Sequence, residues 1–324
     1  MSHLSILAFG QPRAFLSDDC PLQFPTEKSF ELLLMIALAP GRSVGRSSGA
    51  AALRGEHPET QARKALSTDL WRLRKVFDDA NLPSTQVFTT SGRSIAFHDD
   101  LHVFLDARFL EDVWDDVSGV QPDALSPDQA DRIREAIQLY TGDFAQNLDQ
   151  EWCFLYREKL RSIHLTLIGL LLGYEVAADN WASAVQWAER LLECDPLLEH
   201  AHRTLMQCHF LMGNRAVAIR QYSNCRDILE RELGIAPSAE TTRMYRGLVN
   251  VTVDDPVPSR AARLQQTLTL DPPPTSGQGK FPKGSQRPMT DQLSMALGSL
   301  DAARSLVANV DQRLRRMPPE GETS

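Results

Sequence analysis

With 324 residues, the chain is long enough for two or three domains that each have a core. Its hydrophobic content of 42%, charged content of 23% and formal net charge of −8 are ordinary for a globular protein. No stretch approaches the roughly 20 apolar residues of a membrane span, and the N-terminus lacks the segments of an export signal. We therefore expect a cytoplasmic protein that does not contact a membrane.

The first part of the chain is predicted to combine short strands with three helices. The expected strands span 4–9 and 21–24, and the expected helices span 27–38, 43–55 and 58–77. Thr26 can cap the first helix, and Pro40–Gly41 ends it. The third helix begins at Pro58, where proline is tolerated, and Glu59 suits the positive end of the helix dipole.

The third helix carries the strongest functional signal. Its segment from 63 to 75 holds one acid, Asp69, and five cations: Arg63, Lys64, Arg72, Arg74 and Lys75. Apolar residues recur there at steps of three and four: Ala62, Leu66, Leu70, Leu73 and Phe77. The opposite face carries Lys64, Thr68, Trp71 and Lys75, flanked by Ser67, Arg72 and Arg74. Such a face suits the major groove of DNA, but solvated helices carry charges too, and charge alone does not separate the two readings.

A hairpin is predicted to follow the basic helix. Residues 87–90 and 94–97 have the pattern of strands, and Ser91–Gly92–Arg93 forms the turn between them. Strands, three helices and a hairpin in this order indicate a winged helix-turn-helix over residues 1–105. Arg93 then lies at the tip of the wing and is a further candidate for contact with DNA.

The second domain is expected to be all-helical. An acidic stretch at 111–128 is predicted to link it to the first, and residues 127–250 read almost entirely as helix. Asn180–Val185 recurs as Asn214–Ile219 after 34 residues, which is the period of tetratricopeptide repeats. Helix pairs of this kind stack into a solenoid. We assign residues 106–253 to this tetratricopeptide-like domain.

The C-terminal part of the chain has a different composition. Residues 254–288, with the run Pro272–Pro274, lack apolar periodicity and are predicted to be a disordered linker. Residues 289–317 are predicted to form an amphipathic helix with a heptad seam, and 318–324 a disordered tail. This helix fits a short coiled coil and fits equally well docking on the chain's own body.

Several sequence segments together resemble a known family. The segments are LYTGDF at 139–144, ECDPLLEHAHRTLM at 193–206, AIRQYSNCRDILERELGIAPS at 218–238, ARKALSTDLWRLRKVF at 62–77 and TTSGRSIAF at 89–97. The helical part resembles the bacterial transcriptional activator domain, a tetratricopeptide-like module. The N-terminal part resembles the OmpR-type winged helix that precedes this module in regulators of the antibiotic-regulatory type. The matches cover about residues 4–250.

The resemblance implies a mainly α protein that regulates transcription, most simply as an activator that binds promoter repeats. The basic helix would be the recognition helix, and double-stranded DNA the partner. The residues implied to contact DNA are Arg63, Lys64, Ser67, Thr68, Trp71, Arg72, Arg74, Lys75 and Arg93. The helical domain would mediate self-association into a homo-oligomer or contact RNA polymerase.

The second helix departs from the family pattern. Where that pattern has leucine and later a Leu-Trp pair, this chain has Gly49 and Leu53–Arg54. Glycine disfavours helix by up to ~1 kcal/mol relative to alanine, so the helix that braces the recognition helix is expected to be weak. The alternative function is therefore a protein-interaction scaffold whose degenerate winged helix no longer binds DNA.

The sequence offers no sign of an enzyme or of a metal site. It has no P-loop, no HExxH and no GxSxG. Its five cysteines contain no CxxC pair, and its eight histidines form no ligand cluster. We therefore expect no catalytic residues, no bound metal and no cofactor.

Overall fold

The computed structural model describes residues 3–16 and 20–250. Contacts within the chain divide this part into two compact units. The helical unit comprises 3–16, 20–22 and 102–250, and the winged-helix unit comprises 23–101. The N-terminal strands thus group with the helical part and not with the winged helix predicted over residues 1–105. The predicted linker 254–288, amphipathic helix 289–317 and tail 318–324 lie outside the described residues.

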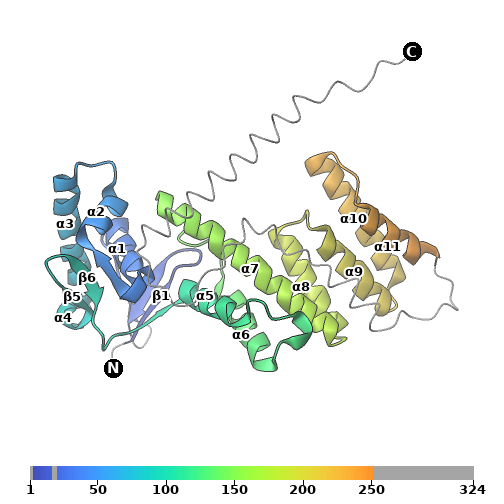
Figure 1. Cartoon of the computed structure of the whole chain (residues 1–324), viewed down its shortest axis with the longest axis horizontal. Coiled ribbons are helices and arrows are strands. Elements are labelled where there is room, and N and C mark those ends of the chain that lie inside the picture. Colours follow the sequence, from blue (N-terminus) through green and yellow to red (C-terminus); the bar gives the residue numbers. More distant parts are fainter. Residues whose placement is uncertain (1–2, 17–19, 251–324) are drawn as a thin grey trace, which may run out of the picture. The chain divides into compact units, whose positions relative to one another are not determined.

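The winged-helix unit contains the predicted three helices and a small sheet (Figure 1). The predicted helices are α1 (Glu27–Leu38), α2 (Arg46–Arg54) and α3 (Glu59–Asp79), with a 3-10 turn η2 (Pro40–Arg42) after α1. A short helix that was not predicted, α4 (Ser84–Val87), follows α3. Strands β4 (Ser43–Gly45), β5 (Phe88–Thr90) and β6 (Ser94–Phe97) form an antiparallel sheet in the order β4-β6-β5. This arrangement is a winged helix-turn-helix.

Local sequence explains how these elements begin. The side chain of Thr26 accepts a hydrogen bond from the N–H of Ser29, so the predicted cap and the bounds of α1 are confirmed. The second predicted helix begins three residues late, because Ser43–Gly45 pairs with β6 and forms β4. Val87 ends α4 instead of opening β5.

The helical unit begins with a four-stranded sheet. Its strands are β1 (His3–Leu7), β2 (Arg13–Leu16), β3 (Cys20–Pro21) and β7 (His102–Leu105), in the order β3-β2-β1-β7. Strand β1 pairs in parallel with β7, and the chain then enters α5 (Asp106–Val117). The buried carboxylate of Asp106 accepts hydrogen bonds from the N–H groups of Ala8, Phe9 and Ala107 at 2.7–3.0 Å. This residue therefore fastens the N-terminal segment to the first helix of the unit.

Seven helices with one 3-10 turn make up the remainder of the described unit. They are α5, η3 (Pro122–Ala124), α6 (Pro127–Leu139), α7 (Glu151–Ala177), α8 (Trp181–Cys194), α9 (Glu199–Leu211), α10 (Arg215–Leu233) and α11 (Ala239–Asn250). The predicted acidic link at 111–128 is wrong, because this stretch includes the second half of α5, η3 and the start of α6. Glu111 is buried there, within ion-pair distance of Arg108 and Lys159.

The structure confirms the predicted 34-residue repeat. Asp179 and Gly213, which precede α8 and α10, both have left-handed backbone with φ of 59° and 79°. The N–H of Asn180 and that of Asn214 each donate a 2.8 Å hydrogen bond to the carbonyl five residues earlier. Ala184 and its counterpart 34 positions later, Ala218, are fully buried. The same turn and the same small contact residue therefore recur in two successive helix pairs, as in tetratricopeptide repeats.

Helix α7 is long and apolar enough, by length and composition, to cross a membrane. However, 67% of its apolar window is buried inside the protein. Leu167, Ile168 and Leu171 have no exposed surface. These values are those of a core helix, around which α6 and α8 pack.

Candidate nucleic-acid interface

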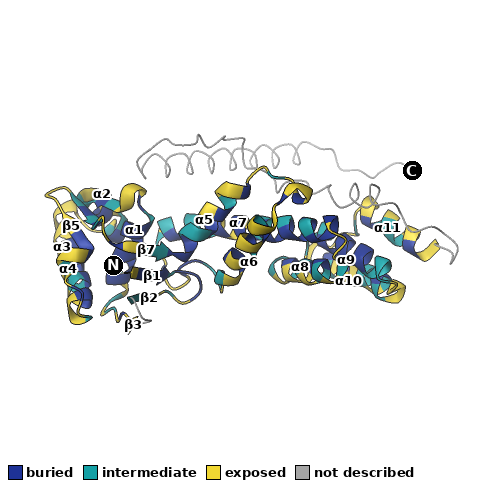
Figure 2. Cartoon of the chain, turned by 90° about the horizontal axis from the view of Figure 1, so that it is seen from below, coloured by how far each residue is buried: buried dark blue, intermediate teal, exposed yellow. Residues whose placement is uncertain are grey.

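Helix α3 has one buried and one exposed side. Its predicted apolar stripe, Ala62, Leu66, Leu70, Leu73 and Phe77, is entirely buried. Of the nine predicted DNA-contacting residues, seven are exposed and only Arg72 and Arg74 are half-buried. Figure 2 shows the exposed residues of the winged-helix unit in yellow and its buried residues in dark blue. The amphipathic character that the spacing predicted is therefore confirmed.

Three of the predicted cations form neither an ion pair nor a side-chain hydrogen bond within the described ranges: Lys64, Lys75 and Arg93. Lys64 and Lys75 belong to the outer stripe of α3, and Arg93 lies in the turn of the β5–β6 hairpin. That turn is ordered by Ser91, whose hydroxyl oxygen accepts hydrogen bonds from the N–H groups of Arg93 and Ser94. The three side chains are thus available to an anionic partner at both the helix and the wing.

Two further predicted cations hold neighbouring elements in place. Arg63 donates a 2.7 Å hydrogen bond to the hydroxyl of Ser47 at the start of α2 and pairs with Glu59 at 2.8 Å. Arg74 donates a 3.0 Å bond to the hydroxyl of Thr90 in β5. These arginines connect α3 to both α2 and the wing, so their guanidinium groups have structural contacts before any partner binds.

The third such cation, Arg72, belongs to a buried ion cluster. Asp69 is only 1% exposed, and its Oδ1 lies 3.4 Å from Nη1 of Arg72. Its other oxygen, Oδ2, lies 3.1 Å from Nη2 of Arg54, which reaches across from α2. The carboxylate therefore joins the two helices of the helix-turn-helix. We call Arg54, Asp69 and Arg72 the α2–α3 ion cluster.

Gly49 lets α2 lie close to its neighbours. A Cβ atom on this glycine would lie 2.9 Å from Cγ1 of Val44 in β4 and 4.0 Å from Cδ2 of Leu66 in α3. Ala50 and Leu53, on the same helix, are almost fully buried. Gly49, which was predicted to weaken α2, is therefore the point where this helix approaches β4 and α3 closely. Arg54 of the ion cluster stands where the family pattern has tryptophan.

Sequence reasoning missed four residues that shape this interface: Arg54, Asp69, Ser47 and Thr90. Arg54 and Asp69 are 15 positions apart and lie on different helices, so helical spacing gives no sign that they meet. A usable signal was the combination of two unusual residues, the arginine at position 54, where the family pattern has tryptophan, and the single acid inside the basic segment of α3. Their opposite charges suggest a pair.

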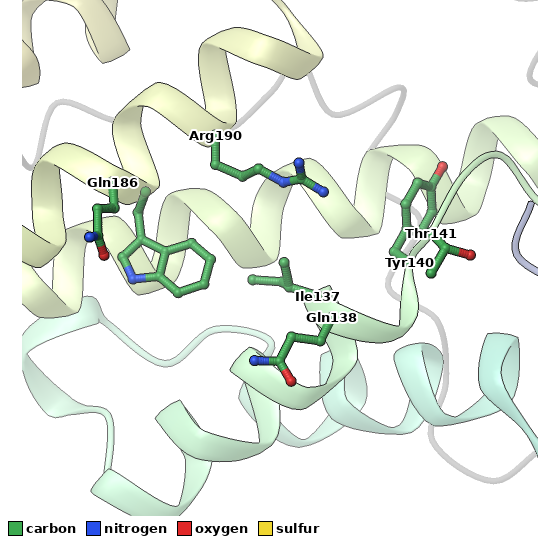
Figure 3. Close-up of a pocket in the computed structure, with 7 residues that line it drawn as sticks. Ile137, Gln138, Tyr140, Thr141, Gln186 and Arg190 are labelled. Atoms are coloured by element: carbon green, nitrogen blue, oxygen red, sulfur yellow. The ribbon is translucent and has the colours of Figure 1, made fainter.

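The helical unit contains a separate open pocket of about 370 Å³ (Figure 3). It is lined by Ile137 and Gln138 at the end of α6, by Tyr140 and Thr141 just after this helix, and by Gln186, Trp187 and Arg190 from α8. In Figure 3, Arg190 extends from its helix over Ile137. No group of three His, Cys, Asp or Glu side chains in the described segments could hold a metal ion.

His164 lies against one wall of this pocket and gives the helical unit a pH dependence. Its ring stacks on Tyr140 with centroids 3.9 Å apart, and burial lowers its pKa to about 4. The unfolded chain binds a proton here below about 6.5, whereas the folded chain does so only near 4, so stability falls as pH drops through this window. From pH 7 to pH 5 the wild-type protein should lose about 1–2 kcal/mol more than His164→Gln in urea unfolding. Equal losses would contradict the buried neutral imidazole.

Comparison with known proteins identifies the helical domain. Residues 106–249 match the sequence profile of the bacterial transcriptional activator domain. The chain therefore contains a bacterial transcriptional activator domain. The match begins at Asp106, the residue that opens α5, and ends within α11. The activator domain thus contains the helix pairs of the repeat.

Two curated relatives and one solved structure extend the likeness to the winged helix. The chain is 25% identical over 291 residues to the regulatory protein AfsR of Streptomyces coelicolor and 23% identical over 304 residues to AfsR of Streptomyces griseus. These alignments cover 86% and 90% of the chain but 28% and 30% of the relatives, so the chain spans less than a third of their length. It also resembles the structure of Mycobacterium tuberculosis EmbR in complex with a low affinity phosphopeptide. The TM-score is 0.61 at 18% sequence identity, and the match covers 82% of this chain and 69% of the EmbR chain. The last comparison supports the fold.

Proposed function

We propose that the chain is a transcriptional regulator and that it activates transcription by binding specific promoter DNA through its winged helix. The observation that carries the proposal is the exposed stripe of α3, where Lys64, Thr68, Trp71 and Lys75 lie opposite a fully buried apolar stripe. Arg93, in the turn between β5 and β6, adds an exposed cation on the wing. A helix of this kind enters the major groove, where cations neutralise phosphates and side chains read base edges.

In this proposal the cations of the interface have two roles, contact with phosphates and attachment of α3 to its neighbours. Lys64, Lys75 and Arg93 contact phosphates directly. Arg63 and Arg74 keep α3 attached to α2 and to the wing while their remaining N–H groups face the DNA. Ser67 and Thr68 donate their hydroxyls to carbonyls of α3 itself, which leaves their oxygens as acceptors. The acidic remainder of the chain restricts nucleic-acid contact to this basic surface.

The proposal is tested by selecting binding sites from random double-stranded DNA with the purified full chain. With about six phosphate contacts, the logarithm of the affinity should fall with the logarithm of the salt concentration with a slope near −5. Replacing both Lys64 and Lys75 by alanine should weaken binding roughly tenfold for every sequence and reduce the slope by about 2. These lysines are chosen because they form neither an ion pair nor a side-chain hydrogen bond in the described part of the chain, whereas Arg72 pairs with Asp69 and Arg74 donates a hydrogen bond to Thr90.

A matched control removes the same charge elsewhere. Arg220 and Arg246 are exposed on α10 and α11, and their double alanine variant should leave both the affinity and the salt slope unchanged. If the wild-type chain selects no sequence even at low salt, the DNA-binding proposal fails. Stable capture of a protein by the helical domain would then support the scaffold function instead.

The helical domain is proposed to mediate self-association or to contact RNA polymerase in the cytoplasm. Stacked helix pairs present an extended surface for partners. Supporting this role, Leu233 at the end of α10 and Ile235 just after this helix are large apolar side chains that are about half exposed. Phe154 on α7 is exposed to a similar degree.

A further inference from the structure

Trp71 is the most exposed large hydrophobic side chain in the described part of the chain, with 62% of its surface accessible. It lies in the middle of α3, on the outer stripe that also carries Thr68 and Lys75. An indole has a large apolar area, and exposing it to water is unfavourable. Its position at the centre of a basic helix face therefore indicates contact with a partner that has both negative charge and an apolar group.

The neighbours of Trp71 restrict the chemistry of that partner. Nζ of Lys75 lies 5.8 Å from the centroid of the indole ring, so a cation sits beside the ring in the free protein. Thr68 and Lys64 lie on the same stripe, about one and two turns before the ring. An apolar protein surface would have to desolvate these cations without compensation, whereas DNA supplies phosphates for them.

The floor of the major groove has one apolar group that an indole can contact, the C5-methyl group of thymine. We infer that Trp71 determines the sequence specificity of DNA binding by packing against thymine methyl groups. This inference rests on the proposed function. Side chains that wedge between bases do so mainly from the minor groove, so the indole of a helix in the major groove lies against base edges. The preferred DNA site should accordingly contain thymine opposite the centre of α3.

Deoxyuracil provides a direct test, because it lacks only the methyl group of thymine and keeps the same base pairing. The full chain first selects its site from random double-stranded DNA. Each thymine of that site is then replaced by deoxyuracil, one at a time. Wild-type protein should lose about fourfold in affinity at one position, or about fifteenfold where two contacted methyl groups are removed together.

Two variants separate the indole from its neighbours. In Trp71→Ala the deoxyuracil penalty should disappear at the contacted position and persist at any thymine read by another residue. Thr68→Ser removes one methyl group from the same stripe and should leave the Trp71-dependent penalty unchanged. Both side chains are exposed, so both variants should retain the thermal stability of the wild type.

The possible outcomes distinguish this inference from the function on which it rests. If the wild type binds a selected site but no thymine is sensitive to deoxyuracil, or the penalty is the same in Trp71→Ala, the reading of thymine by Trp71 is wrong and DNA binding stands. If no DNA is bound at low salt, both fail. A penalty that is present in the wild type and absent only from Trp71→Ala supports the inference.

Discussion

Replacing Asp69 by alanine is expected to lower the free energy of unfolding of the winged-helix unit by about 2–4 kcal/mol. The carboxylate is buried between Arg54 and Arg72, and breaking such a cluster leaves charge without a partner. Arg54 is the more affected arginine, because its side chain is only 24% exposed and its Nε already has no hydrogen-bond partner in the described structure. Urea unfolding of the full chain measures the loss.

The same variant should weaken DNA binding although Asp69 cannot contact the DNA. The ion cluster fixes α3 on α2, so its loss disturbs how the outer stripe is presented. We expect a fall in affinity for the selected site of at least about fivefold, with a salt slope that stays near −5, because every phosphate-contacting cation is still present. A change in slope of about one per lost cation would instead indicate that phosphate contacts had disappeared.

Two comparison variants make the Asp69 result specific. Arg54→Met combined with Asp69→Leu removes both charges and fills the space with apolar atoms, and such exchanges of buried ion pairs are often neutral or stabilising. This double variant should therefore recover most of the stability. Arg63→Ala breaks an exposed pair with Glu59 and should cost less than about 1 kcal/mol. If Asp69→Ala costs no more than Arg63→Ala, the cluster does not brace the helix.

The sequence was sufficient for elements whose signals are local. Helix α1 has a threonine cap and a proline stop, and α3 has five apolar residues at regular spacing, so their positions could be predicted within two residues. The repeat was visible because the same turn and the same alanine recur after 34 residues. In each case the determining contacts lie within a few residues of one another.

The parts that could not be predicted depend on contacts between distant segments. Charge composition alone made 111–128 look like a link, because nothing in its sequence shows that Lys159 neutralises Glu111 on a buried face. The grouping of the N-terminal strands with the helical unit depends on the parallel pairing of β1 with β7 and on the carboxylate of Asp106. Nearly a hundred residues separate these partners, so no local pattern reports them.

Gly49→Leu, which restores the residue of the family pattern, is expected to destabilise the winged-helix unit by about 3 kcal/mol. A Cβ atom at this position would meet Val44 at 2.9 Å, and three more carbons would follow it towards Leu66. Overpacking of this kind costs typically about 1–3 kcal/mol, occasionally more, and exceeds the gain of up to ~1 kcal/mol in helix propensity. Because α2 supports α3, affinity for the selected DNA site should fall at least about tenfold.

The size of the side chain, and not the loss of glycine, should cause this effect. Gly49→Ala should be close to neutral, since its propensity gain offsets one close contact, and adding Val44→Ala should remove that contact. Gly247 provides a matched control on α11, where a methyl group in place of the hydrogen would meet nothing within 4 Å, so Gly247→Ala should stabilise by up to ~1 kcal/mol. If Gly49→Leu instead stabilises the unit, α2 is underpacked in this chain and supports α3 only weakly.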